Sequence, residues 1–318
     1  VNLSGVDLRD RDLSGHDLSR ANLSGANLLG ARLPRKLEGI NLSGVDLQDR
    51  DLSGHDLSRA NLSGANLSGA KMSGARLPRK LEGVNLSGVD LRDRDLSGHD
   101  LTGANLTGAN VSGARLPLKL EGVNLSGVDL RDLDLSGHSL SGANLSGANV
   151  SGARLPRKLA RVNLSGVDLR DRDLSGHDLT GANLSGANVS GARLPRKMER
   201  VNLSGVDLRD LDLSGHDLSG ANLSGANLSG ANLSGANLSN TNLSNCNVSN
   251  INITGCLNIQ AACLNGARGM PAGMQIRCCC GAPGTNLRVN PTKQRNDEYG
   301  QGYLRAVCDR DTRTAVCW

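Results

Sequence analysis

The chain has 318 residues, a formal net charge of +5 at pH 7 and no Phe. Its aromatic residues, Tyr299, Tyr303 and Trp318, lie near the C-terminal end, so the rest of the chain has no ring on which a nucleic-acid base could stack. No apolar run is long enough for a transmembrane helix. We therefore expect neither nucleic-acid binding nor membrane insertion.

A five-residue pattern runs from Asn2 to about Ile253: a small residue, Asn or Asp, Leu, Ser and Gly, as in Ala21–Gly25. A period of five fits neither the 3.6 of a helix nor the 2 of a long strand. It fits a very short strand that directs Leu inward, followed by a Ser-Gly bend. Four such sides close into a square coil, so the repeat predicts a solenoid.

This motif resembles that of the pentapeptide-repeat family, Ala-(Asp/Asn)-Leu-x-x, over residues 1–255. The resemblance implies an all-β fold, a right-handed quadrilateral β-helix in which the central residue and the residue two positions earlier face inward. Family members that mimic DNA and bind gyrase are strongly acidic, so the basic charge disfavours that activity here. The inward residues implied for the first coils are Leu3, Leu8, Leu13, Leu18, Leu23, Leu28, Ala21, Ala26 and Ala31.

A longer repeat lies over the five-residue one. The block that begins VNLSGVDLRD at Val1 begins again, with small changes, at Ile40, Val84, Val123, Val162 and Val201. From Val84 on the spacing is 39 residues, or seven pentapeptides and one four-residue side, so one block makes two coils. The short side falls at the Leu-Pro-Arg-Lys segment, with proline predicted at a corner or small bulge. One extra pentapeptide near residues 71–74 shifts later blocks by one side, so features that recur per block should form two columns.

All six histidines follow Ser-Gly in successive blocks. A shared metal ion is excluded by spacing, since members recur every second coil, roughly 9–10 Å apart, whereas zinc needs nitrogen ligands at about 2.0–2.1 Å. A Ser-His-Asp hydrolase needs one pocket where these groups converge, which a close-packed Leu and Ala core does not offer. We expect no catalytic, cofactor-binding or metal-binding residue in the repeats. A structural role at inward or corner positions is predicted for His16, His55, His99, His138, His177 and His216.

A charged segment, residues 7–12 in the first block, recurs at 46–51 and 90–95. Acidic and basic residues alternate, and adjacent coils could neutralise them, with at most about 1 kcal/mol for each exposed pair. Calcium bound by the aspartates is the alternative. Arg11 and its equivalents occupy an inward-type position where Leu133 and Leu211 also occur. This interchange predicts a half-buried stem with its charged head at the surface.

The composition changes after about residue 255, and all eight cysteines lie between 246 and 317. Residues 256–318 are predicted to form a disulfide-stapled cap or interaction module that ends in a hairpin of 304–308 and 314–318. A thiolate metal site is the alternative. The predicted disulfide cysteines, whose pairing is open, are Cys246, Cys256, Cys263, Cys278, Cys279, Cys280, Cys308 and Cys317.

Disulfides indicate an oxidising compartment, so we expect an extracellular, secreted or cell-surface protein. Val1 is not Met and lies within a repeat, as expected of a mature form after removal of a leader, or of a fragment. The repeat contains many Asn-x-Ser/Thr sequons. Glycans on all of them would collide at a coil spacing of ~4.8 Å, so only a few exposed sequons are expected to carry glycans.

These features predict a non-enzymatic structural protein, a rigid rod that is a subunit of an extracellular or surface assembly. We expect it to associate with itself, for example as a head-to-tail filament, or with another structural protein. The alternative is a binding module whose flat faces recognise a protein partner or a repetitive ligand such as polysaccharide, mineral or ice. An enzyme with its site in residues 256–318 is a further alternative, and no cofactor is expected.

Overall fold

The computed structural model describes residues 1–259, 262–264 and 266–269, together with the backbone of six short strands later in the chain. The chain divides into two compact units, Val1–Pro156 and Arg157–Trp318. Both contain the five-residue repeat, and the second also contains the six strands. The described residues include no helix that is long and apolar enough to span a membrane.

The six strands form three antiparallel pairs, β1 with β2, β3 with β4, and β5 with β6. In the last pair Val307 lies opposite Val316, at the place where the sequence predicts a terminal hairpin. The strands are β1 Gln275–Arg277, β2 Asn286–Arg288, β3 Arg295–Asn296, β4 Gly302–Tyr303, β5 Ala306–Cys308 and β6 Ala315–Cys317.

Each pentapeptide forms one side of a coil, with one bridging residue, one inward Leu and a β-turn. In the first pentapeptide the N–H of Val6 donates to the carbonyl oxygen of Leu3 at 3.2 Å, and Gly5 has a φ of 67°. A positive φ at the third turn position is typical of a type II turn, and glycine adopts it without steric cost. The turn therefore explains why Gly follows Ser in most pentapeptides.

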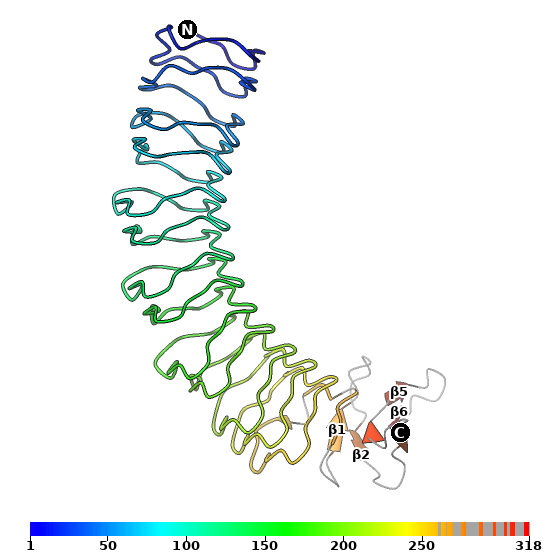
Figure 1. Ribbon diagram of the computed structural model, residues 1–318. Helices are drawn as coiled ribbons and strands as arrows, with labels where there is room; N and C mark the ends of the chain where they lie inside the picture. Colours follow the sequence, from blue (N-terminus) through cyan, green and yellow to red (C-terminus); the bar gives the residue numbers. More distant parts are fainter. Residues whose placement is uncertain are drawn as a thin grey trace. The chain divides into compact units, whose positions relative to one another are not determined.

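Parallel bridges join sides of one coil to sides of the next. Asn2 pairs with Asn22 and Asn85 pairs with Asn105, so the partners are 20 residues apart. Twenty residues are four pentapeptides, which confirms the four-sided coil. Backbone hydrogen bonds run both ways across a bridge: Leu3 donates to Asn22 at 2.7 Å, and Asn22 donates to Val1 at 2.9 Å. Figure 1 shows the stacked coils of residues 1–156 in blue to green.

Leu, Val and Ala side chains fill the inside of the coils. Ala21, Leu23 and Leu28 are at most 1% exposed, and each fully buried Leu contributes roughly 1.5–3 kcal/mol to folding. In the first coil Leu3, Leu8 and Leu13 are only half-buried, because in the structure only the following coil covers them. The inward positions implied by the motif are confirmed. Those that are buried include Leu18, Ala26 and Ala31, and those that are half-buried are Leu3, Leu8 and Leu13.

The extra pentapeptide moves the asparagine column to the next side of the coil. Before it, Asn41 pairs with both Asn22 and Asn61, and after it, Asn66 pairs with Asn85. Asn61 and Asn66 occupy successive sides of one coil. The prediction that block features form two columns is confirmed within residues 1–156.

Two of the eight predicted disulfide cysteines have free thiols. The Sγ of Cys246 donates to the carbonyl oxygen of Leu223 at 2.8 Å, and the Sγ of Cys256 donates to that of Leu233 at 2.8 Å. The disulfide prediction is wrong for these two residues, because their thiols are directed at backbone carbonyl groups of the preceding coil. Burial raises the pKa of Cys246 to about 12.

The remaining cysteine predictions concern the end of the chain. Cys263 is disulfide-bonded. Cys278, Cys279 and Cys280 lie outside the described residues, as do the side chains of Cys308 and Cys317.

Replacing the buried Leu106 by Asp should unfold the neighbouring coils. Leu106 is 0% exposed, so the variant loses the burial of one leucine and forces a carboxyl group into the core, at a cost of more than about 4 kcal/mol. The matched control is Thr107→Asp at the adjacent exposed position, which should change stability by less than about 1 kcal/mol. Chemical denaturation followed by circular dichroism measures both, and equal effects of the two changes would contradict the predicted core.

Thiol labelling should separate the cysteines. Under denaturing but non-reducing conditions, iodoacetamide should modify Cys246 and Cys256, whereas Cys263 should be modified only after reduction. In the folded protein Cys246 should react far more slowly than Cys256, because burial and a raised pKa both suppress its thiolate. Peptide mapping by mass spectrometry reads out each site. Labelling of Cys263 before reduction would contradict the assignment.

Candidate functional site

Successive two-coil blocks in residues 1–156 are joined along one side only. When a block is counted from the lysine of one proline side to that of the next, as from Lys80 to Lys119, all four sides inside it are bridged. Between consecutive blocks the Asn105–Asn124 bridge is present, while the other three sides of this described segment lack one. We call each such boundary a joint. The four bridges inside the block before this joint are Lys80–Asp100, Asn85–Asn105, Asp90–Asn110 and Asp95–Arg115.

The joints follow the four-residue sides that contain proline. Across a joint the bridged partners are 19 residues apart, as in Asn105 and Asn124, so one side keeps its register and the others lose it. Pro34 and Pro117 are buried, one residue before a bend, and proline has no N–H to donate to a ladder. Figure 1 shows the coils of residues 1–156 grouped in pairs along one edge.

The second unit supplies the comparison within the same chain. After Val201 no proline side interrupts the pentapeptides. From there to Asn252 all four sides are bridged at 20-residue intervals. Loss of the ladder therefore accompanies the short side and is not a property of the pentapeptide itself.

Arginine side chains cross the joints and bind carbonyl oxygens that the ladder leaves open. Arg94 donates from Nη1 to the carbonyl oxygen of Met72 at 3.0 Å, and from Nη2 to that of Ala75. Arg50 donates in the same way to the carbonyl oxygen of Ala31. The guanidinium group thus takes the place of a backbone donor from the next coil.

The head groups of Arg50 and Arg94 bind backbone carbonyl oxygens in the joints, so the prediction of a charged head at the surface is wrong for these two residues. Arg11, in the first coil, is exposed. At a bridged side, the carbonyl oxygen in the corresponding position accepts a hydrogen bond from a backbone N–H of the next coil. For example, the backbone carbonyl oxygen of Arg94 accepts one from the N–H of Arg115 at 2.9 Å. At a joint no backbone donor reaches it, and the long arginine side chain does. Desolvation lowers the pKa of Arg50 and Arg94, yet a guanidinium remains charged near neutral pH.

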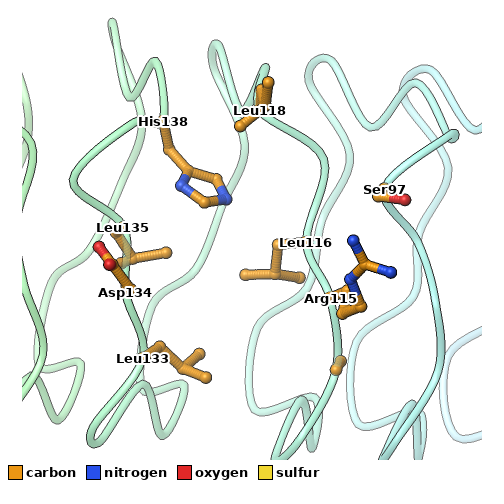
Figure 2. Close-up of a pocket in the computed structure, with 9 residues that line it drawn as sticks. Ser97, Arg115, Leu116, Leu118, Leu133, Asp134, Leu135 and His138 are labelled. Atoms are coloured by element: carbon orange, nitrogen blue, oxygen red, sulfur yellow. The ribbon is translucent and has the colours of Figure 1, made fainter.

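Within residues 1–156, one joint has leucine in place of the arginine, at Leu133. A cavity of about 440 Å³ opens there, lined by Leu116, Leu118, Leu133, Leu135 and His138 among others. Figure 2 shows Leu133 and His138 facing Leu116 across this gap. Because leucine cannot donate a hydrogen bond, this joint is apolar where the others are polar.

Comparison with known proteins agrees with the repeat geometry. The family model described as pentapeptide repeats matches residues 2–35, 40–77, 84–117, 119–157, 159–196, 202–240 and 231–268. The chain belongs to the pentapeptide-repeat family. No curated protein matches it.

Three solved structures illustrate its likeness to other pentapeptide-repeat proteins. HetL, involved in heterocyst differentiation regulation in the cyanobacterium Nostoc sp. strain PCC 7120, is 29% identical over 84% of this chain and 88% of its own, with a TM-score of 0.21. QnrB1, a plasmid-mediated fluoroquinolone resistance protein, is 20% identical over 60% of this chain and 89% of its own, with a TM-score of 0.20. Rfr23 from the cyanobacterium Cyanothece 51142 is 21% identical over 59% and 92%, with a TM-score of 0.16.

Two histidine rings of this pentapeptide-repeat protein contact backbone carbonyl groups. Nε2 of His216 is 3.3 Å from the carbonyl oxygen of Leu194 in the preceding coil, and its Nδ1 is 3.0 Å from that of Ser214. Nδ1 of His55 is 3.3 Å from the carbonyl oxygen of Ser53. At both residues the ring thus contacts the carbonyl group of the serine in its own turn. Among the described residues, no three His, Cys, Asp or Glu side chains are grouped as metal ligands.

Three other histidines have a different environment. His99, His138 and His177 are half-buried, and each has a buried Nδ1 without a hydrogen-bond partner. Desolvation lowers the pKa of His99, which the carbonyl groups of Leu96 and Leu77 partly oppose. The neutral ring is therefore favoured at this position at neutral pH.

Exposed ion pairs recur along the outside of the coils. Asp90 and Arg92, two residues apart in one coil, approach to 2.6 Å. Asp95 pairs with Arg115 of the next coil at 3.3 Å, which confirms the expected neutralisation between adjacent coils. Hydrogen bonds from the hydroxyl and backbone N–H of Ser97 lower the pKa of Asp95. Each pair is solvent-exposed, so it contributes little to stability.

The joints were not predicted from the sequence, although two signals in it point to them. Proline in a four-residue side removes a backbone donor and shortens the coil at the same place. The interchange of Arg94-type residues with Leu133 indicates a position that faces inward over its whole length. Together these two signals predict carbonyl oxygens that lack a backbone partner. They also predict a long inward side chain nearby that can donate hydrogen bonds to them.

Arg94→Ala should destabilise the first unit by about 1–3 kcal/mol, because it leaves the carbonyl oxygen of Ala75 unpaired in a buried site. The carbonyl oxygen of Met72 keeps the hydrogen bond from the backbone N–H of Ala75. Arg94→Leu should cost less, since leucine refills part of the space, as at Leu133. The matched control is Arg92→Ala, which breaks an exposed ion pair and should cost less stability than Arg94→Ala. Urea denaturation measures all three. A larger cost for Arg92→Ala than for Arg94→Ala would contradict the role of the joint arginine.

Proposed function

We propose that this protein is a non-enzymatic structural protein, a rigid β-solenoid rod that acts as a subunit of an extracellular or surface assembly. The observation that carries the proposal is the repetition of the same exposed groups once per two-coil block. A fold of this kind presents identical contacts at fixed intervals, which suits lateral association with copies of itself or with another structural protein.

The exposed Asp-Arg pairs supply such a row. Asp90–Arg92 and Asp129–Arg131 occupy the same side of consecutive blocks, and both pairs are 2.6 Å apart. They lie two coils from each other, or ~10 Å. Because each pair carries both charges, a second copy related by a two-fold axis can place its Arg against Asp and its Asp against Arg.

Three further features bear on where the protein is located, on how it assembles and on whether it carries glycans. The disulfide at Cys263 favours an oxidising compartment and hence a secreted or cell-surface protein. A head-to-tail filament would use the ladder itself, because the edge of one parallel coil is complementary to the opposite edge of another. Sequons at exposed asparagines such as Asn110 leave room for a small number of glycans.

The proposal predicts concentration-dependent and salt-sensitive association. Sedimentation velocity from low to high micromolar concentration should show larger species that dissociate in 0.5 M salt, since exposed charge pairs are screened. The double variant Arg92→Glu, Arg131→Glu should weaken association at least tenfold. The matched control, Lys80→Glu with Lys119→Glu, changes the net charge equally on another side of the coil and should associate like the parent.

A strictly monomeric parent at high concentration would overturn the self-assembly proposal. Electron microscopy of the same samples distinguishes its forms: filaments that lengthen support head-to-tail contact, and sheets or bundles support lateral contact.

The alternative is a binding module for a repetitive ligand, and the asparagine column favours it. Asn85 donates to Asn66 at 2.8 Å, Asn105 to Asn85 at 3.0 Å and Asn144 to Asn124 at 3.0 Å. This row holds amide groups in fixed orientations at the coil spacing. A polysaccharide, mineral or ice lattice has repeating polar groups that such a row could match. Co-sedimentation with insoluble polysaccharide, mineral particles or growing ice crystals tests it, and depletion by none of them would exclude this function.

A further inference from the structure

Two joints of residues 1–156 contain the same cavity in two chemical versions. A cavity of about 540 Å³ includes Arg50 and Ala31 in its lining. The cavity of about 440 Å³ described above has Leu133 and Ala114 at the same positions of its blocks. Other matched pairs in the two linings are Leu33 with Leu116 and His55 with His138. The two cavities can therefore be compared position by position.

Three residues that are charged in the other blocks are uncharged around the second cavity. Leu133 and Leu118 stand where the other blocks of residues 1–156 have arginine, and Ser139 stands where they have aspartate. In residues 157–318 the first of these changes recurs at Leu211, but the second position there keeps Arg196. All three losses of charge thus coincide at a single joint.

The loss of the arginine also leaves a carbonyl oxygen without a donor. The carbonyl oxygen of Ala31 accepts a hydrogen bond from the guanidinium group of Arg50, and that of Ala75 accepts one from Arg94. The equivalent oxygen, that of Ala114, accepts no hydrogen bond in the described structure. Ala114 is only 7% exposed, and a buried carbonyl group without a partner calls for an explanation. The second cavity therefore offers an acceptor that the protein itself does not use.

The rest of the lining is apolar and large enough for a small molecule. Leu116, Leu133 and Leu135 line the cavity, and Leu118, which is 66% exposed, lies at its edge. Figure 2 shows these leucines and His138 around the gap. An apolar cavity of about 150 Å³ holds benzene. A cavity of about 440 Å³ therefore has room for a molecule roughly two to three times as large as benzene.

We propose that the joint of Leu133 is a binding site for a small, uncharged, apolar molecule that bears a hydroxyl group. The hydroxyl group donates to the carbonyl oxygen of Ala114, as a guanidinium group does at Ala31 and Ala75. The apolar part of the molecule packs against Leu116, Leu118 and Leu133 and is removed from water.

A charge on the bound molecule would find no free partner in the lining. Arg115 and Asp134 also line the cavity, but Arg115 pairs with Asp95 at 3.3 Å and Asp134 pairs with Arg154 at 3.5 Å. Burying an unpaired charge is costly, so an uncharged molecule is favoured. This site is separate from the exposed Asp-Arg pairs proposed for assembly, and either proposal can fail without the other.

Nuclear magnetic resonance of the full chain with 2-naphthol as the probe tests the site. 2-Naphthol is apolar, uncharged at neutral pH and carries one hydroxyl group. With ¹³C labels in leucine methyl and alanine carbonyl groups, its addition should shift the methyl signals of Leu116, Leu118 and Leu133 and the carbonyl signal of Ala114 along one saturating curve.

Two related molecules separate the roles of the hydroxyl group and of charge. 2-Methoxynaphthalene has the same rings but cannot donate a hydrogen bond, so it should shift the leucine signals and leave the Ala114 carbonyl signal in place. 2-Naphthoate carries a negative charge that must lose its water, and it should bind at least about tenfold more weakly than 2-naphthol.

Protein variants test the position of the site. Leu133→Arg restores the residue found at Arg94, which fills the cavity and donates to Ala114 itself, so the affinity for 2-naphthol should fall at least about tenfold. The matched control Leu211→Arg makes the same change at the equivalent position of the second unit and should bind like the parent. Leu118→Arg alters an exposed side chain and should also weaken binding, which keeps the test decisive if Leu133→Arg fails to fold by circular dichroism.

The proposal is overturned if 2-naphthol shifts none of these signals up to its solubility limit, or if the parent and the arginine variants bind it equally well. Binding that leaves the Ala114 carbonyl signal unchanged would contradict the role of the hydroxyl group. Leucine signals that move with protein concentration in the absence of the probe would show that a second copy of the chain covers the cavity, and would also overturn the proposal.

Discussion

Backbone hydrogen bonding between consecutive coils is the constraint on which this structure depends. A coil of 20 residues, such as that between Asn202 and Asn222, keeps all four sides in register, so every bridging residue finds a donor and an acceptor above and below. A coil shortened by one residue at a proline side keeps register on one side only. The carbonyl oxygens released on the other sides are buried or half-buried, and unpaired groups of this kind are costly. Arg94 and His99 have long side chains that point into the joints. We interpret them as hydrogen-bond donors to the carbonyl oxygens that have lost their backbone partners there.

The continuous column explains the choice between asparagine and aspartate. In most pentapeptides the bridging side chain accepts a hydrogen bond from a backbone N–H two residues later, as Asn105 does from Thr107 at 3.1 Å and Asp95 does from Ser97 at 3.0 Å. An amide can also donate to the next coil, which a carboxylate cannot. Asn therefore fits the one side that stays bridged across every joint, as in the donation from Asn105 to Asn85 at 3.0 Å. Aspartate lies opposite a cation of the neighbouring coil in some bridges, such as Asp95 with Arg115, and opposite asparagine in others, such as Asp90 with Asn110.

The features set by local sequence could be predicted, and those set by the neighbouring coil could not. The buried Leu23, the four-sided coil and the shift of columns after the extra pentapeptide all follow from counting residues in one chain. The head of Arg94 and the free thiol of Cys246 depend on whether a carbonyl oxygen of the preceding coil is within reach.

The inward position two residues before each Leu shows how coil spacing selects side chains. Where all four sides are bridged, as in residues 221–252, this position holds Ala221 and other small residues. Polar members there make one short bond to a carbonyl oxygen of the preceding coil, as Thr241 does to Leu218 at 2.9 Å. A guanidinium or imidazole group needs the additional space of a joint. Arginine at such a position in a fully bridged coil would therefore force the ladder apart, whereas Leu133 shows that an apolar residue is accepted at a joint. The proline side must accordingly accompany the long donors: it creates both the space they occupy and the carbonyl oxygens they bind.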